Sequence, residues 1–432
     1  MISACRRRFS LQTMKSIPTR TICGHEYEMD SMTNITPAIA SRLSHKLLSQ
    51  PSSPLALLWR RIQRHFDSRH PGVFDFLRHD DPIVPVQQNF DELLIPASHP
   101  SRSPNDSYYL NRKMMLRTHM TAHEREVMAT GRKSFFLVGD VYRRDQIDCS
   151  HMPVFHQLEG VCIFSPDELL SREAEYSHLV GEIEKAIGSQ VLQVEHDPKI
   201  VKLALADLYV TLHGLMKTLF GENSRIRWQE TFFPFTRPST EAEVFYDNRW
   251  LEVFGSGILQ RQVLHPSVLE RDPNAIAWAF GMGLERVAMV LHGINDIRLF
   301  WSQDDRFISQ FSSQKEDSEP IKFVPFSKYP PICRDISFYL PTTRDFQPNE
   351  LYEIIRDVAP DLVEAVTLAD EYHDTKINRM SMCYRIVYRS MEKTLTDTLV
   401  NNLQSELRAR VTRQLQQSHH MMADRIFSNL DL

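Results

Sequence analysis

The 432-residue sequence has few cysteines, no long apolar run and no excess of positive charge. Its six cysteines are scattered without a Cys-x-x-Cys pair, which argues against a structural zinc site and against the disulfide framework of a secreted protein. We therefore expect a reducing compartment. No run approaches the roughly 20 apolar residues that a membrane span needs, so no membrane partner is expected. The formal net charge is −5, so any nucleic-acid contact must come from local basic patches.

Acidic residues are absent from residues 1–25, which contain Arg6, Arg7, Arg8, Lys15 and Arg20 together with several Ser and Thr. The apolar core that a secretory signal requires is absent as well. This composition is typical of a mitochondrial presequence, and it predicts a location in the mitochondrial matrix. A disordered basic tail is the alternative interpretation.

Length and composition, with 24% charged and 42% hydrophobic residues, fit a soluble protein of two to three domains. We expect a first domain over residues 35–302, with helices over 169–187 and 200–220 and a strand over 225–236. Residues 303–322 are rich in Ser, Gln and acids and are expected to form a linker. Residues 323–427 read β-α-β-β-α, the order of a ferredoxin-like sandwich, with Leu399 on the apolar stripe of the last helix.

The stretch from Gly139 to Gly160 carries the densest set of polar groups on strand-like runs. Arg143 follows the first run, and Phe155, Gln157 and Glu159 alternate along the second. Period 2 directs these three side chains to one face of a sheet. A cation, an aromatic face and a carboxylate on a rigid hairpin suit a phosphate, a base ring and an ammonium group. An amphipathic hairpin with a solvated polar face is the alternative for any single residue.

This stretch resembles motif 2 of the class II aminoacyl-tRNA synthetases, in the version of the phenylalanyl branch. The resemblance rests on Phe155, His156, Gln157, Glu159 and Gly160. It implies an α+β fold, in which an antiparallel-sheet catalytic domain is followed by a ferredoxin-like α/β sandwich that binds the anticodon.

A second stretch, from Gly281 to Arg286, opens a helix that is expected to run to about Leu291, with Arg286 opposite the apolar face. A helix N-terminus beside a projecting arginine makes an anion site. Together with Trp278-Ala279-Phe280 before it, this stretch resembles motif 3 of the same class.

Two further features allow more than one interpretation. Phe233-Pro234-Phe235 fits core packing, but in the phenylalanyl branch the same tripeptide lines the amino-acid pocket, and we favour the pocket. A hairpin is expected around Asp247-Asn248, ending at Gly255-Ser256-Gly257. Glu252 on its second strand is either a magnesium ligand or a solvent-facing glutamate.

The resemblance implies activation of L-phenylalanine by ATP and Mg²⁺, and transfer of the phenylalanyl group to tRNA(Phe). It implies ATP contacts at Arg143, Asp145, His151, Phe155, Gly283 and Arg286, with Arg143 and Arg286 as the catalytic cations. It implies amino-acid contacts at His119, Thr121, Gln157, Glu159, Phe233, Phe235 and Ala279. Asp145 and Thr121 stand where the family usually has Glu and Ser.

The last domain contains a local excess of basic residues. Between Arg379 and Arg413 there are seven basic residues and three acids. A solvated face is one interpretation, but in an anticodon-binding domain we favour phosphate contact. The predicted tRNA-binding residues are Arg379, Arg385, Arg389, Arg408 and Arg410.

Both domains stand in one chain, and no editing domain is inserted between them. This arrangement resembles the single-chain mitochondrial form of the phenylalanyl branch and predicts a monomer. A bacterial-type α-subunit would need a separate partner to supply the last domain. A non-catalytic tRNA-binding paralogue should lose Arg143, Arg286 or Glu159, and all three are present.

Overall fold

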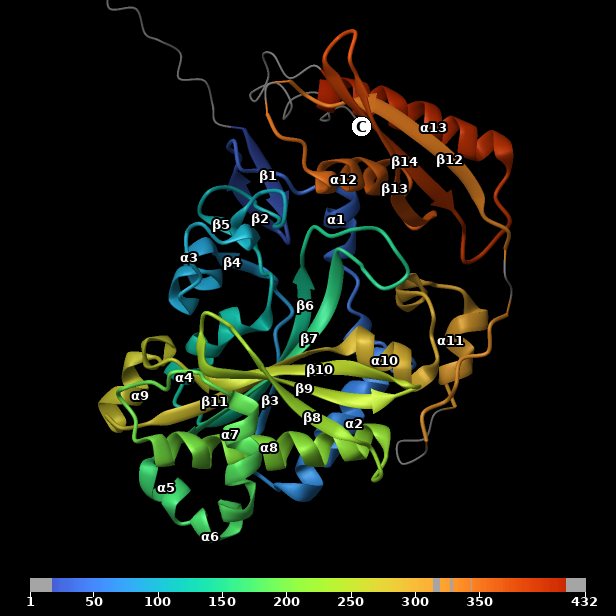
Figure 1. Ribbon diagram of the computed structural model, residues 1–432. Helices are drawn as coiled ribbons and strands as arrows, with labels where there is room; N and C mark the ends of the chain where they lie inside the picture. Colours follow the sequence, from blue (N-terminus) through green and yellow to red (C-terminus); the bar gives the residue numbers. More distant parts are fainter. Residues whose placement is uncertain (1–17, 314–318, 327–328, 343, 417–432) are drawn as a thin grey trace, which may run out of the picture.

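The computed structural model describes residues 18–313, 319–326, 329–342 and 344–416, which form a larger N-terminal domain and a smaller C-terminal domain (Figure 1). The N-terminal domain is built on a seven-stranded sheet with the order β3-β6-β7-β11-β10-β9-β8. Strand β3 is parallel to β6, and the other neighbours are antiparallel. The bounds are β3 Asp75–Arg78, β6 Ser134–Tyr142, β7 Val154–Phe164, β8 Ile226–Thr231, β9 Thr236–Tyr246, β10 Arg249–Leu259 and β11 Ile276–Gly283.

Three long helices, α2 (Pro54–Arg69), α8 (Pro198–Phe220) and α10 (Leu284–His292), cover one face of this sheet. The main apolar core lies between them and the sheet, and it includes Phe136, Leu158 and Trp278. By length and composition α8 is apolar enough to cross a membrane, but most of it is buried in this core. Its apolar character is therefore accounted for by packing inside the domain.

Shorter elements complete the N-terminal domain on both faces of the sheet. The 3-10 helix η4 (Met120–His123) runs directly into α4 and carries several predicted site residues. The remaining bounds are β1 Thr19–Ile22, β2 His25–Glu28, α1 Pro37–Arg42, β4 Ile83–Pro85, α3 Val86–Asn89, β5 Met114–Leu116, α4 Glu124–Ala129, α5 Pro166–Leu170, α6 Glu173–Tyr176, α7 Val180–Ile187, α9 Pro266–Arg271 and α11 Asp305–Phe311.

Both hairpins predicted from the sequence are present. Strands β6 and β7 pair antiparallel, with Gly139 opposite Gln157. Strands β9 and β10 are joined by Asp247 and Asn248, which both have positive φ, 47° and 59°. Such a two-residue turn requires positive φ at both positions, and Asp and Asn tolerate it better than most residues.

Strand β10 does not end at Gly255-Ser256-Gly257 as expected, because it continues to Leu259. These glycines serve close approach instead: a Cβ at Gly255 would lie 2.7 Å from Cζ of Phe233. The strand expected over 225–236 is also interrupted after Thr231, and the following aromatic residues form a loop before β9 begins. The helix expected over 169–187 is divided into α5, α6 and α7, and Arg172 at the first break pairs with the buried Asp207.

Two expected segment boundaries also differ from the structure. Residues 1–17 lie outside the described residues, but Thr19–Glu28 forms a hairpin whose Ile22 is buried, so the expected end of the presequence at residue 25 falls within folded structure. The segment 303–322 contains α11, because Phe307 and Phe311 are buried in the N-terminal core. Phe323 packs in the same core, so the C-terminal domain begins later than residue 323.

The C-terminal domain has the predicted β-α-β-β-α order. Its sheet has the order β12-β14-β13, and the helices are α12 and α13. The bounds are β12 Ile332–Tyr339, α12 Pro348–Val358, β13 Val363–Asp374, β14 Arg379–Tyr388 and α13 Asp397–Val411. On α13, Val400 is buried while Leu399 is exposed, so Leu399 does not belong to the apolar stripe. Residues 417–432 lie outside the described residues.

Candidate active site

The β6–β7 hairpin brings a cation, an aromatic ring and a carboxylate together, as the sequence predicted. The guanidinium of Arg143 lies 5.3 Å from the ring centroid of Phe155, and its Nε donates a hydrogen bond to the carbonyl oxygen of Thr118 at 2.7 Å. Burial lowers the pKa of Arg143, whereas the negative charges of Glu159 and Asp145 act in the opposite direction. Arg143 remains protonated at neutral pH and can bind an anion in this partly buried place.

Glu159 is only 4% exposed, and η4 supplies its hydrogen-bond donors. The backbone N–H and the side-chain hydroxyl of Thr121 both donate to its carboxylate. The positive charge of Arg143 also interacts with this carboxylate and favours its ionised form. The predicted pair of Thr121 and Glu159 is therefore brought together. Burial raises the pKa of Glu159 above its ordinary value, against the opposing effect of these donors.

His119 lies beside the same group. Burial and the nearby charge of Arg143 lower the pKa of His119 to about 3, so its imidazole is neutral. Within the described residues, neither of its ring nitrogens has a hydrogen-bond partner, and Oε1 of Gln157 has none either. Buried polar atoms are costly to leave unpaired, so these atoms mark a place that a polar ligand can complete.

Strand β11 leaves space above this group. Gly281 pairs with Glu159 and Gly283 pairs with Gln157 in the β7–β11 register. Neither glycine carries a side chain, and a Cβ built at Gly283 would meet no atom within 4 Å. A Cβ at Gly281 would lie 3.4 Å from Cγ of Glu159, so β11 passes close to Glu159 and leaves room beside Gln157.

Phe233 and Phe235 form a parallel pair of rings, with centroids 5.9 Å apart and an interplanar angle of 12°. Their loop is fixed by Gln260, whose side chain donates to the carbonyl oxygen of Pro234 at 2.6 Å. The ring of Phe235 lies 6.3 Å from that of His119, and both phenylalanines are half-buried. Phe235 packs on the apolar cluster that includes Ala279, so the pocket interpretation fits better than complete burial in the core.

The β11–α10 turn also agrees with the prediction. Gly283 is the N-cap residue of α10, and Leu284, Val287, Ala288 and Leu291 are buried. Arg286 projects from the opposite face, where its side chain is 56% exposed and lies 3.3 Å from the carboxylate of Glu252. Glu252 is half-exposed and stands opposite Glu243 across the β9–β10 pair.

The structure does not join His151 to the group around Arg143. Nδ1 of His151 lies 2.8 Å from the carboxylate of Asp148, within the loop between β6 and β7. His151 lines a cavity together with Arg356 and Asp361 of the C-terminal domain. The carboxylate of Asp145 acts on Arg143 by its negative charge.

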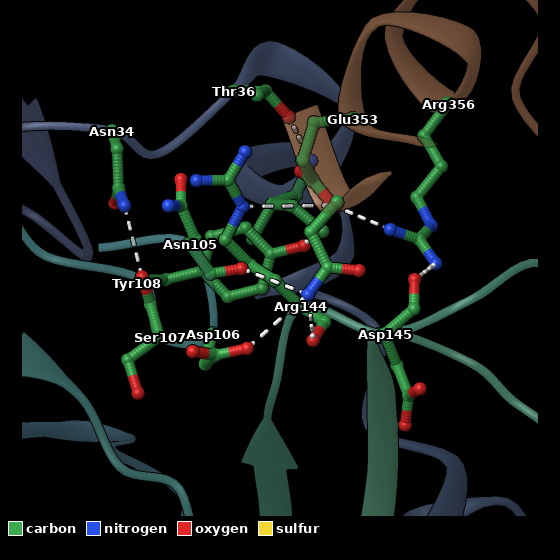
Figure 2. Close-up of polar contacts among 12 residues, drawn as sticks. Asn34, Thr36, Asn105, Asp106, Ser107, Tyr108, Arg144, Asp145, Glu353 and Arg356 are labelled. Atoms are coloured by element: carbon green, nitrogen blue, oxygen red, sulfur yellow. Dashed lines mark hydrogen bonds and ion pairs between the residues drawn. The ribbon is translucent and has the colours of Figure 1, made fainter. Parts of the chain in front are cut away.

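Helix α12 of the C-terminal domain holds the same loop (Figure 2). Arg356 donates hydrogen bonds to the backbone carbonyl oxygens of Asp145 and Gln146, the second at 2.9 Å. Asn349 donates to the carbonyl oxygen of Arg144 at 3.2 Å. One end of the predicted ATP site is therefore held by the other domain.

The same contact is continued by side chains from both domains. The hydroxyl of Tyr108 donates to Glu353 at 2.8 Å, and Arg144 lies 4.0 Å from Glu353 (Figure 2). Ile147 packs in the apolar core of the C-terminal domain, and its carbonyl oxygen accepts from the N–H of Val366 at 3.0 Å. The loop is thus shared between the two domains.

Three important residues were not predicted. Glu285 is 2% exposed and accepts hydrogen bonds from the backbone N–H of His156 at 2.8 Å and from its ring at 2.6 Å. Burial lowers the pKa of His156, but the charge and hydrogen bond of Glu285 outweigh it and raise the pKa. Arg117 is fully buried and pairs with Asp140 at 2.6 Å, so it supports the sheet. Glu124 is 1% exposed beside Glu159.

A sequence signal existed for two of them. Glu285 interrupts the apolar face of a helix, and Arg117 follows a strand-like apolar run, so each is a charged residue at a position expected to be buried. For Glu124 the sequence offers no such signal, because it begins a short polar helix.

Most of the predicted tRNA-binding arginines are paired. Arg385 bonds to Asp335 through two nitrogens, each at 2.9 Å, and Arg389 pairs with Glu364 at 2.6 Å. Arg410 pairs with both Asp357 and Glu406, and the guanidinium of Arg379 lies 5.0 Å from the ring centroid of Tyr339. Arg408 is exposed, and no ion pair of its side chain is seen in the part of the chain that the structure describes.

Comparison with known proteins agrees with this geometry. The family described as "tRNA synthetases class II core domain (F)" matches residues 53–187 and 189–311, which is more than half of the chain. The family described as "Ferredoxin-fold anticodon binding domain" matches residues 327–419. The class that these matches define is that of the class II aminoacyl-tRNA synthetases with an appended anticodon-binding domain.

Curated relatives specify the branch. The phenylalanine–tRNA ligase, mitochondrial, of Mus musculus is 45% identical over 392 residues, which cover 88% of this chain and 84% of the mouse protein. The phenylalanine–tRNA ligase, mitochondrial, of Saccharomyces cerevisiae is 35% identical over 446 residues, which cover 92% of this chain and 94% of the yeast protein. The chain therefore belongs to the family of mitochondrial phenylalanine–tRNA ligases.

A bacterial relative bears on the alternative of a separate α-subunit. The phenylalanine–tRNA ligase alpha subunit of Aeromonas hydrophila is 35% identical over 230 residues, which cover only 52% of this chain. The single-chain relatives cover the C-terminal domain as well, so the α-subunit alternative is not favoured.

Proposed function

We propose that this chain activates L-phenylalanine with ATP and transfers the phenylalanyl group to tRNA(Phe) in mitochondrial protein synthesis. One observation carries the proposal: the β6–β7 hairpin and η4 gather an arginine, a ring, a carboxylate and unpaired polar atoms beside two parallel phenylalanine rings. The family membership supports the same reaction.

In the activation step, the amino-acid carboxylate attacks the α-phosphorus of ATP and pyrophosphate leaves. The protein contributes position and charge rather than a covalent intermediate. Arg143 would bind the α-phosphate and the attacking carboxylate, since it is a protonated guanidinium held beside Phe155. Phe155 would stack on the adenine ring, with Asp145 near its amino group.

At the other end of the nucleotide, Arg286 would bind the γ-phosphate from the N-terminal turn of α10, next to Gly283. His151 would reach a phosphate through its Nε2, because its Nδ1 is bonded to Asp148. The exposed pair of Arg286 and Glu252 leaves the guanidinium free to exchange one anionic partner for another.

Mg²⁺ is the expected counter-ion of the phosphates. Glu252 offers carboxylate oxygens, the ligand type that this hard cation prefers, whereas Glu243 opposite it already accepts from Arg227 and Gln229. The residues present therefore fit such an ion, with Glu252 as its first protein ligand. When bound, Mg²⁺ would neutralise charge on the phosphates.

The amino acid would lie between the acceptors of η4 and β7 and the two aromatic rings. Its ammonium group fits Gln157, Glu159, Thr121 and His119, where polar atoms are buried and some have no partner within the described ranges. Its phenyl ring fits Phe233 and Phe235, with Ala279 as the wall at the end of the ring. Apolar walls and a polar base discriminate by shape rather than by hydrogen bonds to the ring.

In the transfer step, the 2′-hydroxyl of the terminal adenosine of the tRNA would take the phenylalanyl group. The C-terminal domain would hold the tRNA through Arg379, Arg385, Arg389, Arg408 and Arg410. We further propose that the chain works as a monomer in the mitochondrial matrix, and that residues up to the start of β1 form its presequence.

The test is exchange of pyrophosphate into ATP by the purified chain. We expect exchange that depends on added phenylalanine, followed by charging of tRNA(Phe). Exchange that is independent of phenylalanine, or supported better by another amino acid, would contradict the proposal. A chain that binds tRNA without exchange would instead support a non-catalytic paralogue.

A further inference from the structure

Glu124 and Glu159 form a pair of buried carboxyl groups. Glu124 is the first residue of α4, and the two side chains are 1% and 4% exposed. A hydrogen bond joins the two carboxyl groups, while Thr121 donates to Glu159 from its backbone and its hydroxyl. Because an ionised carboxylate can only accept, a hydrogen bond between two carboxyl groups requires one proton on the pair.

The surroundings indicate which member carries this proton. Glu159 accepts two hydrogen bonds from Thr121 and interacts with the positive charge of Arg143. Both interactions favour its ionised form. Glu124 has no such support: burial and the negative charge of Glu159 raise its pKa well above the ordinary value. Glu124 is therefore the donor and Glu159 the acceptor in the empty site, and the pair has one negative charge.

The pair lies beside an acceptor that has no donor. Oε1 of Gln157, two residues before Glu159 on β7, is buried and has no hydrogen-bond partner in the described part of the chain. An ammonium group has three N–H donors and one positive charge. It can donate to Oε1 of Gln157 and to the carboxyl pair, and its positive charge stabilises the ionised form of both glutamates.

We propose that Glu124 and Glu159 hold one proton between them in the empty site, and that the ammonium group of the amino acid releases this proton when it binds. This inference rests on the proposed function. The O–H bond of Glu124 breaks, the proton passes to a base of the solvent buffer, and both carboxylates become ionised. The charge of the pair changes from −1 to −2, and the ammonium group adds +1.

Other titratable groups around the pair do not account for such a proton. His119 is already neutral, with its pKa lowered to about 3 mainly by burial. His123 and Glu126 bond to each other at 3.1 Å, and Arg271 on α9, which packs on α4, bonds to backbone carbonyl oxygens of Gly131 and Ser267. Arg143 acts by charge on both Glu159 and His119, and His123 is held between Arg117 and Glu126.

The first test measures the KM for phenylalanine in pyrophosphate exchange between pH 5.5 and 7.5. Because the empty site holds one proton more than the occupied site, falling pH favours the empty site. We expect the KM to rise as pH falls, by up to about tenfold per pH unit, the limit for one linked proton. At pH values above the pKa of the pair in the empty site, the KM should not depend on pH.

Glu124→Gln separates this linkage from other pH effects. Glutamine keeps a donor toward Glu159 and an oxygen toward the ligand, but it has no proton to release. We expect its KM to vary by less than about twofold over the same range. Glu126→Gln, on the exposed side of the same turn, is the matched control and should keep the wild-type slope.

The second test counts protons directly and needs no catalysis. Phenylalanine is titrated calorimetrically into the full chain at pH 6.5 in two buffers of different ionisation enthalpy. We expect release of up to one proton by the wild type and by Glu126→Gln, and close to none by Glu124→Gln. Phenylalanine binding without proton release in the wild type, or with equal release in Glu124→Gln, would overturn the inference.

The outcomes distinguish the inference from the function on which it rests. Phenylalanine-dependent exchange with a flat pH profile would overturn the inference and leave the proposed function intact. Absence of phenylalanine binding and of exchange would overturn both. If Glu124→Gln does not fold, the proton count of the wild type decides.

Discussion

In the active site, both ring nitrogens of His119 and Oε1 of Gln157 are buried without a partner among the described residues. In the C-terminal domain, by contrast, Arg385, Arg389 and Arg410 are each paired with an acid, although Nε of Arg389 is itself buried without a partner in the described residues. Buried polar groups without a partner suit a small ligand that supplies hydrogen bonds to several of them at once. Paired surface charges exchange one partner for another, which suits a long polyanion bound by many weak contacts.

Arg143→Ala is the strongest way to break this comparison, because it removes the charge at the centre of the ligand site. We expect loss of about 2.7–4 kcal/mol of transition-state stabilisation, the usual effect of one deleted charge-stabilising donor. The measurement is kcat/KM for phenylalanine-dependent exchange. Arg132→Ala, before the other end of β6, is the control and should exchange normally. Near-normal exchange by a folded Arg143→Ala protein would refute the role of Arg143.

A chain that ends at Phe326 tests the two regions separately. Phe323 packs in the N-terminal core, so the truncation must follow it rather than precede it. Exchange should persist, whereas aminoacylation should fall by at least about tenfold, as the loss of 1.4 kcal/mol of tRNA binding already requires. Circular dichroism checks the fold. Charging of tRNA at the rate of the full chain would show that the C-terminal domain does not bind the anticodon.

Ala279→Gly sharpens the description of the ligand site. Removal of one carbon from the pocket wall should admit para-substituted phenylalanines, with a change in discrimination of about 1–3 kcal/mol. The ratio of kcat/KM for phenylalanine and para-chlorophenylalanine measures it. Ala277→Gly, two residues earlier on the same strand and buried, is the control. An unchanged ratio would remove Ala279 from the pocket.

The smallest expected effect compares two arginines of the C-terminal domain. Arg408 is exposed without a visible ion pair in the described residues, whereas Arg385 is bonded twice to Asp335. Arg408→Ala should reduce the slope of log K against log salt for tRNA binding by about 1, the value for one phosphate contact. Arg385→Ala should change it less, because the arginine must first leave its acid. Equal effects would mean that pairing with acids does not weaken phosphate contact.

The sequence predicted those parts of the site that depend on local pattern. Alternation along β7 assigns Phe155, Gln157 and Glu159 to one face, and the pair Asp247-Asn248 gives a two-residue turn. Glycine misled the prediction at Gly255, since it serves turns and close approach alike, and only the position of Phe233 decides between them. Local sequence patterns indicate which face of a strand a residue lies on and where an element ends, but they do not indicate which distant residue it contacts.

Contacts between distant segments were therefore missed. Glu285 meets His156, and Glu124 meets Glu159, across separations that no periodicity describes. The linker prediction missed α11 for the same reason. The segment is mostly polar, and its two phenylalanines, Phe307 and Phe311, are seen to be core residues only from their contacts in the folded domain.

The loop after β6 has a consequence for how the enzyme is organised in time. Its carbonyl oxygens at Asp145 and Gln146 are held by Arg356, and Ile147 is embedded in the other domain. Ordering a loop costs about 1–2 kcal/mol of conformational entropy per residue, and here this cost is met during folding, before any nucleotide arrives. An N-terminal domain without the C-terminal domain would have to order this loop each time it binds ATP. Its KM for ATP should therefore be higher, although all of its own ATP-site residues are present.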